Sequence, residues 1–115
     1  MTSIGHLLNR QLTVWRTQTV PDGAGGEETT TSQVATVRAK VDQPSPTERL
    51  IAAQAGSTHS HDIWLLPTAG VQRGDELRGT DALGKAQVFR VLSVVQPSRP
   101  IYSKAFAELV QEEGA

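Results

Sequence analysis

The chain has 115 residues, a formal net charge of −1, 37% hydrophobic residues and no cysteine. This length predicts a single domain, residues 1–115, and the scattered Lys and Arg residues lack the basic patch that a nucleic-acid binder working alone normally carries. The absence of cysteine excludes disulfides, thiolate metal ligands and cysteine nucleophiles.

The N-terminal residues 1–9 are expected to form a short arm. They include Ile4, Leu7 and Leu8, but they have neither the basic lead-in nor the long apolar run of a signal peptide. No part of the sequence approaches the roughly 20 apolar residues of a membrane-spanning helix. We therefore expect a soluble, intracellular protein.

Residues 11–20 and 28–43 predict the two strands of a long β-hairpin. The first strand alternates in polarity and is rich in Thr and Val, with Leu12 and Val14 on one face and Trp15 on the other as an anchor or an interface residue. Proline, aspartate and glycines between the strands favour a turn with a flexible tip. The candidate partner or channel contacts at this tip are Asp22, Gly23, Gly25, Gly26 and Glu27.

The sequence SPTERLIAAQAG, residues 45–56, carries the strongest helix signal. At the start of the helix, Ser45 suits the N-cap, Pro46 suits the first helical position, and Glu48 completes a capping box with Ser45. At its end, Gly56 suits the left-handed backbone conformation that terminates many helices. A helix of about ten residues is marginal in water, so we expect it to dock, either as a plug of one barrel end or as a mobile or interfacial element. The candidate contacts on it are Glu48, Arg49, Leu50 and Ile51, and Arg49 is suited to face a phosphate backbone.

Four more strands are expected after the helix, at residues 58–66, 75–78, 86–95 and 102–113, with 86–95 the most apolar. The last stretch contains helix formers but also alternates, and we interpret it as a closing strand. Because turns and not crossover helices connect the strands, the predicted fold class is all-β. We expect a mainly antiparallel small barrel or sandwich with one short inserted helix and an N-terminal arm.

Several residue groups resemble parts of metal, catalytic or phosphate-binding sites, but each lacks a residue that such a site needs. His59 and His61 are expected on one outer strand face, but zinc needs three or four protein ligands and the remaining histidine is distant in sequence. No G-x-S-x-G turn accompanies the serines, and the glycines at 23–26 lack the G-K-[ST] ending of a phosphate loop. Asp75 and Glu76 are interpreted as solvated turn charges. We expect no enzyme activity, no metal site and no cofactor.

The order of these signals along the chain is distinctive. It is carried by Leu12 and Val14, Gly25-Gly26, Ala35-Thr36-Val37, Ala39 and Val41, Glu48, Ala52-Ala53-Gln54, His61 with Ile63 and Leu65, Gly74-Asp75, and Val91 with Val94. Over roughly residues 7–110, this order resembles the head–tail joining, or head-completion, proteins of tailed bacteriophages. Each motif is weak alone, and the resemblance rests on their order and spacing.

The resemblance implies a β-barrel-like subunit of a ring beneath the portal, of the stopper or head-closure type. The implied partners are further copies of the chain, a portal or adaptor protein on the head side, a tail terminator or tail tube protein on the other side, and packaged double-stranded DNA in the lumen. No membrane is implied. The implied location is the neck of the virion, after assembly in the host cytoplasm. One inward Arg per subunit would form a basic collar, whose attraction to phosphates weakens with salt.

Two alternatives stay open. A tail terminator, or another neck ring protein, is also a small β protein that forms rings. An alternative of another class is a small barrel that binds single-stranded nucleic acid, with Trp15, Trp64 or Phe89 as stacking platforms. The near-neutral charge weighs against this second alternative.

Overall fold

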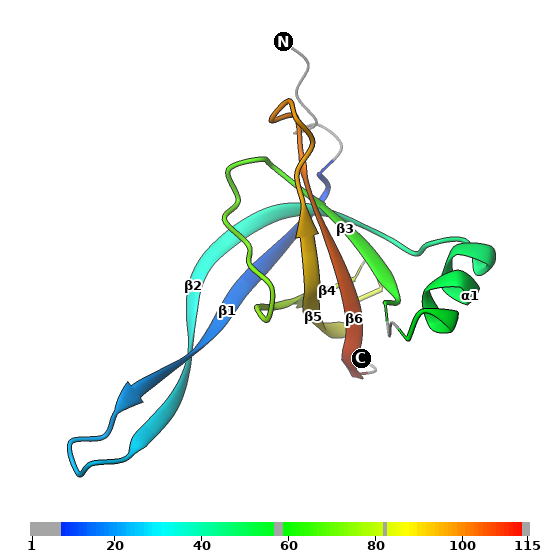
Figure 1. The fold of residues 1–115 in the computed structure, drawn as a ribbon. Helices are drawn as coiled ribbons and strands as arrows, with labels where there is room; N and C mark the ends of the chain where they lie inside the picture. Colours follow the sequence, from blue (N-terminus) through cyan, green and yellow to red (C-terminus); the bar gives the residue numbers. More distant parts are fainter. Residues whose placement is uncertain (1–7, 57–58, 82, 114–115) are drawn as a thin grey trace.

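Six antiparallel strands and one helix make up the part of the chain that the computed structural model describes, residues 8–56, 59–81 and 83–113 (Figure 1). The strands are β1 (Arg10–Pro21), β2 (Glu27–Asp42), β3 (His61–Leu65), β4 (Glu76–Thr80), β5 (Ala86–Val95) and β6 (Ser103–Glu113), and α1 (Pro46–Gln54) lies between β2 and β3. They pair in the order β1-β2-β3-β6-β5-β4, and pairing of β1 with β4 closes a barrel. The all-β prediction is confirmed, and the fold is a barrel.

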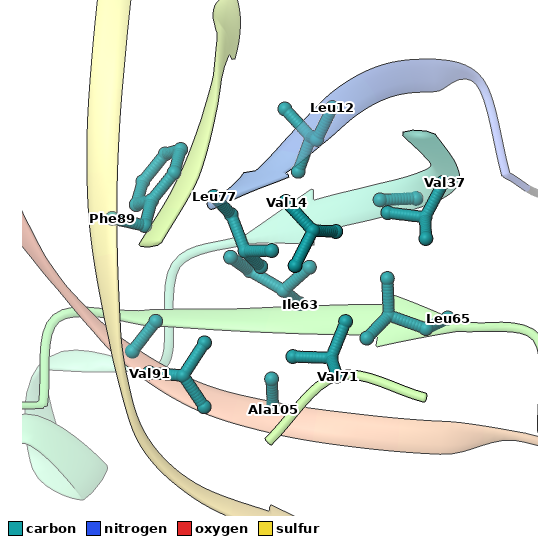
Figure 2. Packing of buried hydrophobic residues seen from close by; sticks show 12 residues of the cluster. Leu12, Val14, Val37, Ile63, Leu65, Val71, Leu77, Phe89, Val91 and Ala105 are labelled. Carbon is teal, nitrogen blue, oxygen red and sulfur yellow. The ribbon is translucent and has the colours of Figure 1, made fainter. Parts of the chain in front are cut away.

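The barrel interior is filled by apolar side chains at alternate strand positions, because successive side chains of a strand point to opposite faces. Figure 2 shows side chains from all six strands converging on this core. Its largest members are Phe89, Leu12, Ile63, Leu65, Leu77, Val14 and Val91. The predicted inward face of the first strand and the apolar strand at 86–95 are thus confirmed.

The ambiguous C-terminal stretch forms β6, as interpreted. β6 pairs with β3 on one side and β5 on the other, so a helix there would leave the barrel open. Ala105 and Ala107 are fully buried and face the interior, whereas Phe106 faces outward against His59.

The helix is capped as predicted but does not dock on the barrel. The Glu48 N–H donates to Ser45 Oγ at 3.2 Å, and Gly56 ends the turn with φ of 81°. Within the described residues, α1 contacts none of the strands, and Figure 1 shows it standing beside the barrel. The plug interpretation is therefore wrong, because a plug would contact the strands at one end of the barrel. None of the helices in the described part of the chain is long and apolar enough to cross a bilayer.

Of the predicted N-terminal arm, residues 1–7 lie outside the described residues. Leu8 is buried, and its carbonyl accepts a hydrogen bond from Arg38 Nη2 at 3.0 Å. Leu8, the first described residue, is therefore fixed against β2.

Gly79 of β4 is expected to tolerate no side chain, because a Cβ there would lie 2.6 Å from Leu12 Cδ2 and 3.1 Å from the Gln11 carbonyl oxygen. Leu12 is fully buried, so it has little room to move. We expect Gly79→Ala to lower the free energy of unfolding by about 1–3 kcal/mol, the usual cost of overpacking. Urea unfolding measures this, with the exposed Thr80→Ala on the same strand as control. A midpoint for Gly79→Ala equal to that of the wild type would contradict the expectation.

Candidate functional site

The first candidate surface is the hairpin arm, defined here as residues 17–34, which extends beyond the barrel (Figure 1). Its register runs from Thr17 opposite Thr31 to Pro21 opposite Glu27, and the hydroxyls of Thr17 and Thr31 lie 2.8 Å apart. Every residue of the arm is exposed. Threonine is enriched in strands, and the contact between the Thr17 and Thr31 hydroxyls is a cross-strand pair that supports this hairpin.

The arm ends in a structured turn. Asp22 Oδ1 accepts hydrogen bonds from the N–H groups of Ala24, at 2.8 Å, and Gly26, at 3.0 Å. Gly23 and Gly25 have φ of 83° and 87°, a region that L side chains rarely adopt. The glycine-rich tip forms a turn as predicted, and the carboxylate of the aspartate that precedes the glycines accepts hydrogen bonds from its backbone.

The turn is expected to respond to acid. The hydrogen bonds from the backbone N–H groups of Ala24 and Gly26 lower the pKa of Asp22 below its ordinary value of 3.8. The turn is therefore fully stabilised above pH 3.8, and this contribution is lost as pH falls through the lower folded-state pKa. NMR titration of the Ala24 and Gly26 amides should show a midpoint below 3.8, absent in Asp22→Asn. A midpoint at or above 3.8 would count against this turn geometry.

The arm is acidic. Its charged residues are Asp22, Glu27 and Glu28, whereas all Lys and Arg residues lie elsewhere in the chain. Hydrogen bonding keeps Asp22 ionised to low pH. An acidic arm repels phosphate, so its chemistry fits a protein surface better than DNA.

An ion pair between the half-buried Arg16 and a buried carboxylate fixes the base of the arm to the barrel. Arg16 binds both carboxylate oxygens of Asp75, Nε to Oδ1 and Nη2 to Oδ2, each at 2.9 Å. Gln72 N–H donates to the same carboxylate at 2.9 Å, and Asp75 is 1% exposed. The carboxylate raises the pKa of Arg16. The interpretation of Asp75 and Glu76 as solvated turn charges is wrong. The turn before β4 points Asp75 inward at Arg16, and Glu76 lies in β4, where its Oε1 accepts a hydrogen bond from Arg78 Nη2 at 2.6 Å.

The second candidate surface is α1. Leu50 and Ile51 are 60% and 61% exposed, and Glu48 and Arg49 are exposed beside them. The helix therefore presents two large aliphatic side chains that pack on none of the described strands. Figure 1 shows the arm and α1 leaving the barrel on different sides, so the two groups of predicted contact residues do not form one site.

The two histidines do not share an outer face, contrary to expectation. His59 Nε2 lies 2.6 Å from Asp62 Oδ1, whereas His61 is 8% exposed and packs its ring on Phe89, 5.0 Å between centroids. The strand begins only at His61, so strand alternation does not extend back to His59. In residues 8–56, 59–81 and 83–113, no group of three or more His, Asp or Glu is placed to hold a metal ion.

An outer cluster on β3 and β6 was not predicted. Lys104 Nζ lies 4.6 Å from the ring centroid of Trp64 and 4.9 Å from that of Phe106, and Tyr102 packs edge-on against Trp64. Period-two alternation of both strands could have placed these side chains together. Phe89 is fully buried, so it offers no stacking platform for a base.

The chain matches the family model described as phage head completion protein over residues 5–114. Among solved structures, it is similar to the solution structure of protein SF1141 from Shigella flexneri 2a, with 18% identity, 94% of each chain covered and a TM-score of 0.70. That likeness shows the barrel fold alone. No curated protein matches the chain.

Proposed function

This chain belongs to the phage head completion protein family, and from that premise we propose that it is a subunit of a ring at the head–tail interface. Family membership gives it a structural role in the phage head, as part of the virion. In the proposal, the ring joins a portal or adaptor protein to a tail terminator or tail tube protein. It also helps to close the DNA channel after packaging.

The observation that carries the proposal is a closed barrel with two projections that pack on nothing else in the described chain. All strands of a closed barrel are paired on both sides, so the barrel itself has no free strand edge for a neighbour to bind. We therefore assign the contacts with neighbours to the elements that project from the barrel. Here these projections are the hairpin arm, residues 17–34, and α1 with Leu50 and Ile51. A rigid body with two separate contact elements suits a subunit that has neighbours on several sides.

Charge distinguishes the roles proposed for the two projections. The acidic arm is assigned to protein contacts, because phosphate would repel Asp22, Glu27 and Glu28. α1 carries one exposed cation, Arg49, beside one exposed anion, Glu48, and in the proposal the ring repeats Arg49 once per subunit around the lumen. Such a collar attracts DNA by an electrostatic term that weakens as salt rises.

Cryo-electron microscopy of the phage particles that contain this protein tests the proposal. A ring of six-stranded barrels is expected between portal and tail, with α1 on the lumen side. The position of the ring along the axis of the particle distinguishes the two roles. A head-closure ring lies on the head side, and a tail terminator lies on the tail side. Barrels on the capsid surface or on a tail fibre would refute the proposal.

A further inference from the structure

The hairpin arm has two outer strand edges without a partner among the described residues. β4 pairs with β1 only from Thr13 to Trp15, and β3 pairs with β2 only from Ala39 to Asp42. Beyond these positions, β1 and β2 have only each other. The arm is therefore a two-stranded ribbon, which is marginally stable in water unless further strands or a packing partner support it.

The hydrogen-bond pattern identifies which backbone groups face outward. The Asp22 N–H donates to the Gly26 carbonyl at 3.2 Å, so the pair Pro21 and Glu27 is of the non-hydrogen-bonded type. Alternation then gives the same type to Thr19 with Thr29 and to Thr17 with Thr31. The close approach of the Thr17 and Thr31 hydroxyls, 2.8 Å, agrees, because side chains lie closer in such pairs. The backbone groups of these residues point away from the hairpin.

These edges lack most of the features that keep strand edges apart. Exposed edges are usually blunted by lysine, proline, a bulge or a covering loop. The arm contains no Lys or Arg, Pro21 is its single proline, and the bulge between Val14 and Trp15 lies at its base. Glu27 and Glu28 are the charged side chains on these edges, and the remaining outward-facing positions are the threonines Thr17, Thr19, Thr29 and Thr31, whose free backbone groups can accept another strand.

We propose that the arms of neighbouring copies of this chain pair edge to edge, with residues 17–21 of one copy antiparallel to residues 27–31 of the next. The inference rests on the ring assembly proposed above and names the surface that forms it. A second copy fits because the two edges have equal lengths and opposite strand directions. In a ring, each copy meets its neighbour's β2 edge with its own β1 edge, so both edges of every arm are used.

Such pairing has an electrostatic signature. Strands in a sheet lie about 4.8 Å apart, so successive hairpins repeat about every 10 Å, close to the Debye length at 0.1 M salt. The acidic residues Asp22, Glu27 and Glu28 of neighbouring arms would then repel one another. Added salt should favour assembly, the opposite of an assembly held by attraction between unlike charges.

The test substitutes an outward N–H. Thr29→Pro removes the N–H of Thr29 from the edge and leaves the pairing between β1 and β2 intact, since proline is tolerated where its nitrogen faces outward. Thr29→Val keeps this N–H and is the matched control. Sedimentation velocity of the full chain over a wide concentration range measures assembly. Thr29→Pro is expected to weaken assembly about tenfold or more, Thr29→Val to assemble like the wild type, and both to keep the wild-type melting temperature.

Hydrogen exchange of the wild type gives a second readout. The amides of Thr17, Thr19, Thr29 and Thr31 should become protected on assembly. Two results would overturn the inference and leave the proposed ring intact. In one, these amides exchange as fast in the ring as in the monomer. In the other, Thr29→Pro and Thr29→Val form rings equally well. A wild-type chain that remains monomeric at every concentration and salt level would overturn the ring and the inference with it.

Discussion

Arg16→Ala is expected to lower the free energy of unfolding by about 3–5 kcal/mol, a large part of the stability of a domain of this size. The substitution leaves the carboxylate of Asp75, which is 1% exposed, without its bidentate partner. The Gln72 N–H remains as a donor, but one neutral hydrogen bond does not compensate a buried negative charge. Thermal unfolding should show the loss as a decrease in melting temperature of about 10 °C or more.

Arg78→Ala is the matched control for this prediction. Arg78 also pairs with a carboxylate, that of Glu76 at 2.6 Å, but its side chain is 39% exposed. Exposed pairs contribute about 0–1 kcal/mol, and the Arg78 guanidinium, 4.3 Å from the Trp15 ring centroid, adds about 0.5–1 kcal/mol, so the control should lose about 2 kcal/mol at most. In the double variant Arg16→Ala/Asp75→Ala, the cost should be smaller than the sum of the single costs, because no buried charge is left. Equal melting temperatures for Arg16→Ala and Arg78→Ala would contradict the assignment of a buried pair.

Local patterns predicted most of the elements. The β1–β2 hairpin, the cap of α1 at Ser45 and the closing strand β6 each depend on residues that are close in sequence, through alternation, side-chain hydrogen bonds or glycine conformations. Barrel closure follows from pairing of β1 with β4, which joins residues far apart in sequence. Alternation alone was therefore compatible with a barrel or a sandwich, and only the pairing decided between them.

The errors involve long-range partners. Asp75 was interpreted as a turn charge because its partner, Arg16, lies 59 residues away. His61 was expected outside because strand alternation was extended back to His59, but β3 starts only where His61 pairs with Ala107 of β6. The barrel-plug interpretation of α1 rested on the marginal stability of a short helix in water, and this argument does not say which surface such a helix packs on.

The candidate contacts were predicted from a glycine-rich hairpin tip and a short capped helix, and the structure places them all on the surface. What the sequence could not show is that they form two separate surfaces, or that residues 17–34 expose two backbone edges. Edges arise from where neighbouring strands stop pairing. That depends on the lengths of β3 and β4 and not on the sequence of the arm.

Shortening the arm is expected to abolish ring assembly without unfolding the barrel. Gln18 and Thr30 form a pair of the hydrogen-bonded type, which a two-residue Asn-Gly turn can close, so residues 19–29 can be replaced by Asn-Gly. The replaced residues are all exposed, and the melting temperature should therefore change little. Several backbone hydrogen bonds between copies would be lost, which should weaken each contact by about 100-fold or more. Sedimentation velocity of the purified chain measures the assembly.

A second replacement separates the tip from the edges. Val20 and Glu28 also form a hydrogen-bonded pair, so Asn-Gly in place of residues 21–27 removes the tip but keeps most of each edge. If the edges carry the contact between copies, this variant assembles, and the loss of two acidic residues at the tip lowers the salt it requires. If it fails to assemble although its barrel melts normally, the contact lies in the turn built by Asp22 and its glycines. Rings formed by the variant that lacks residues 19–29 would exclude the arm from assembly and leave α1 as the remaining projection.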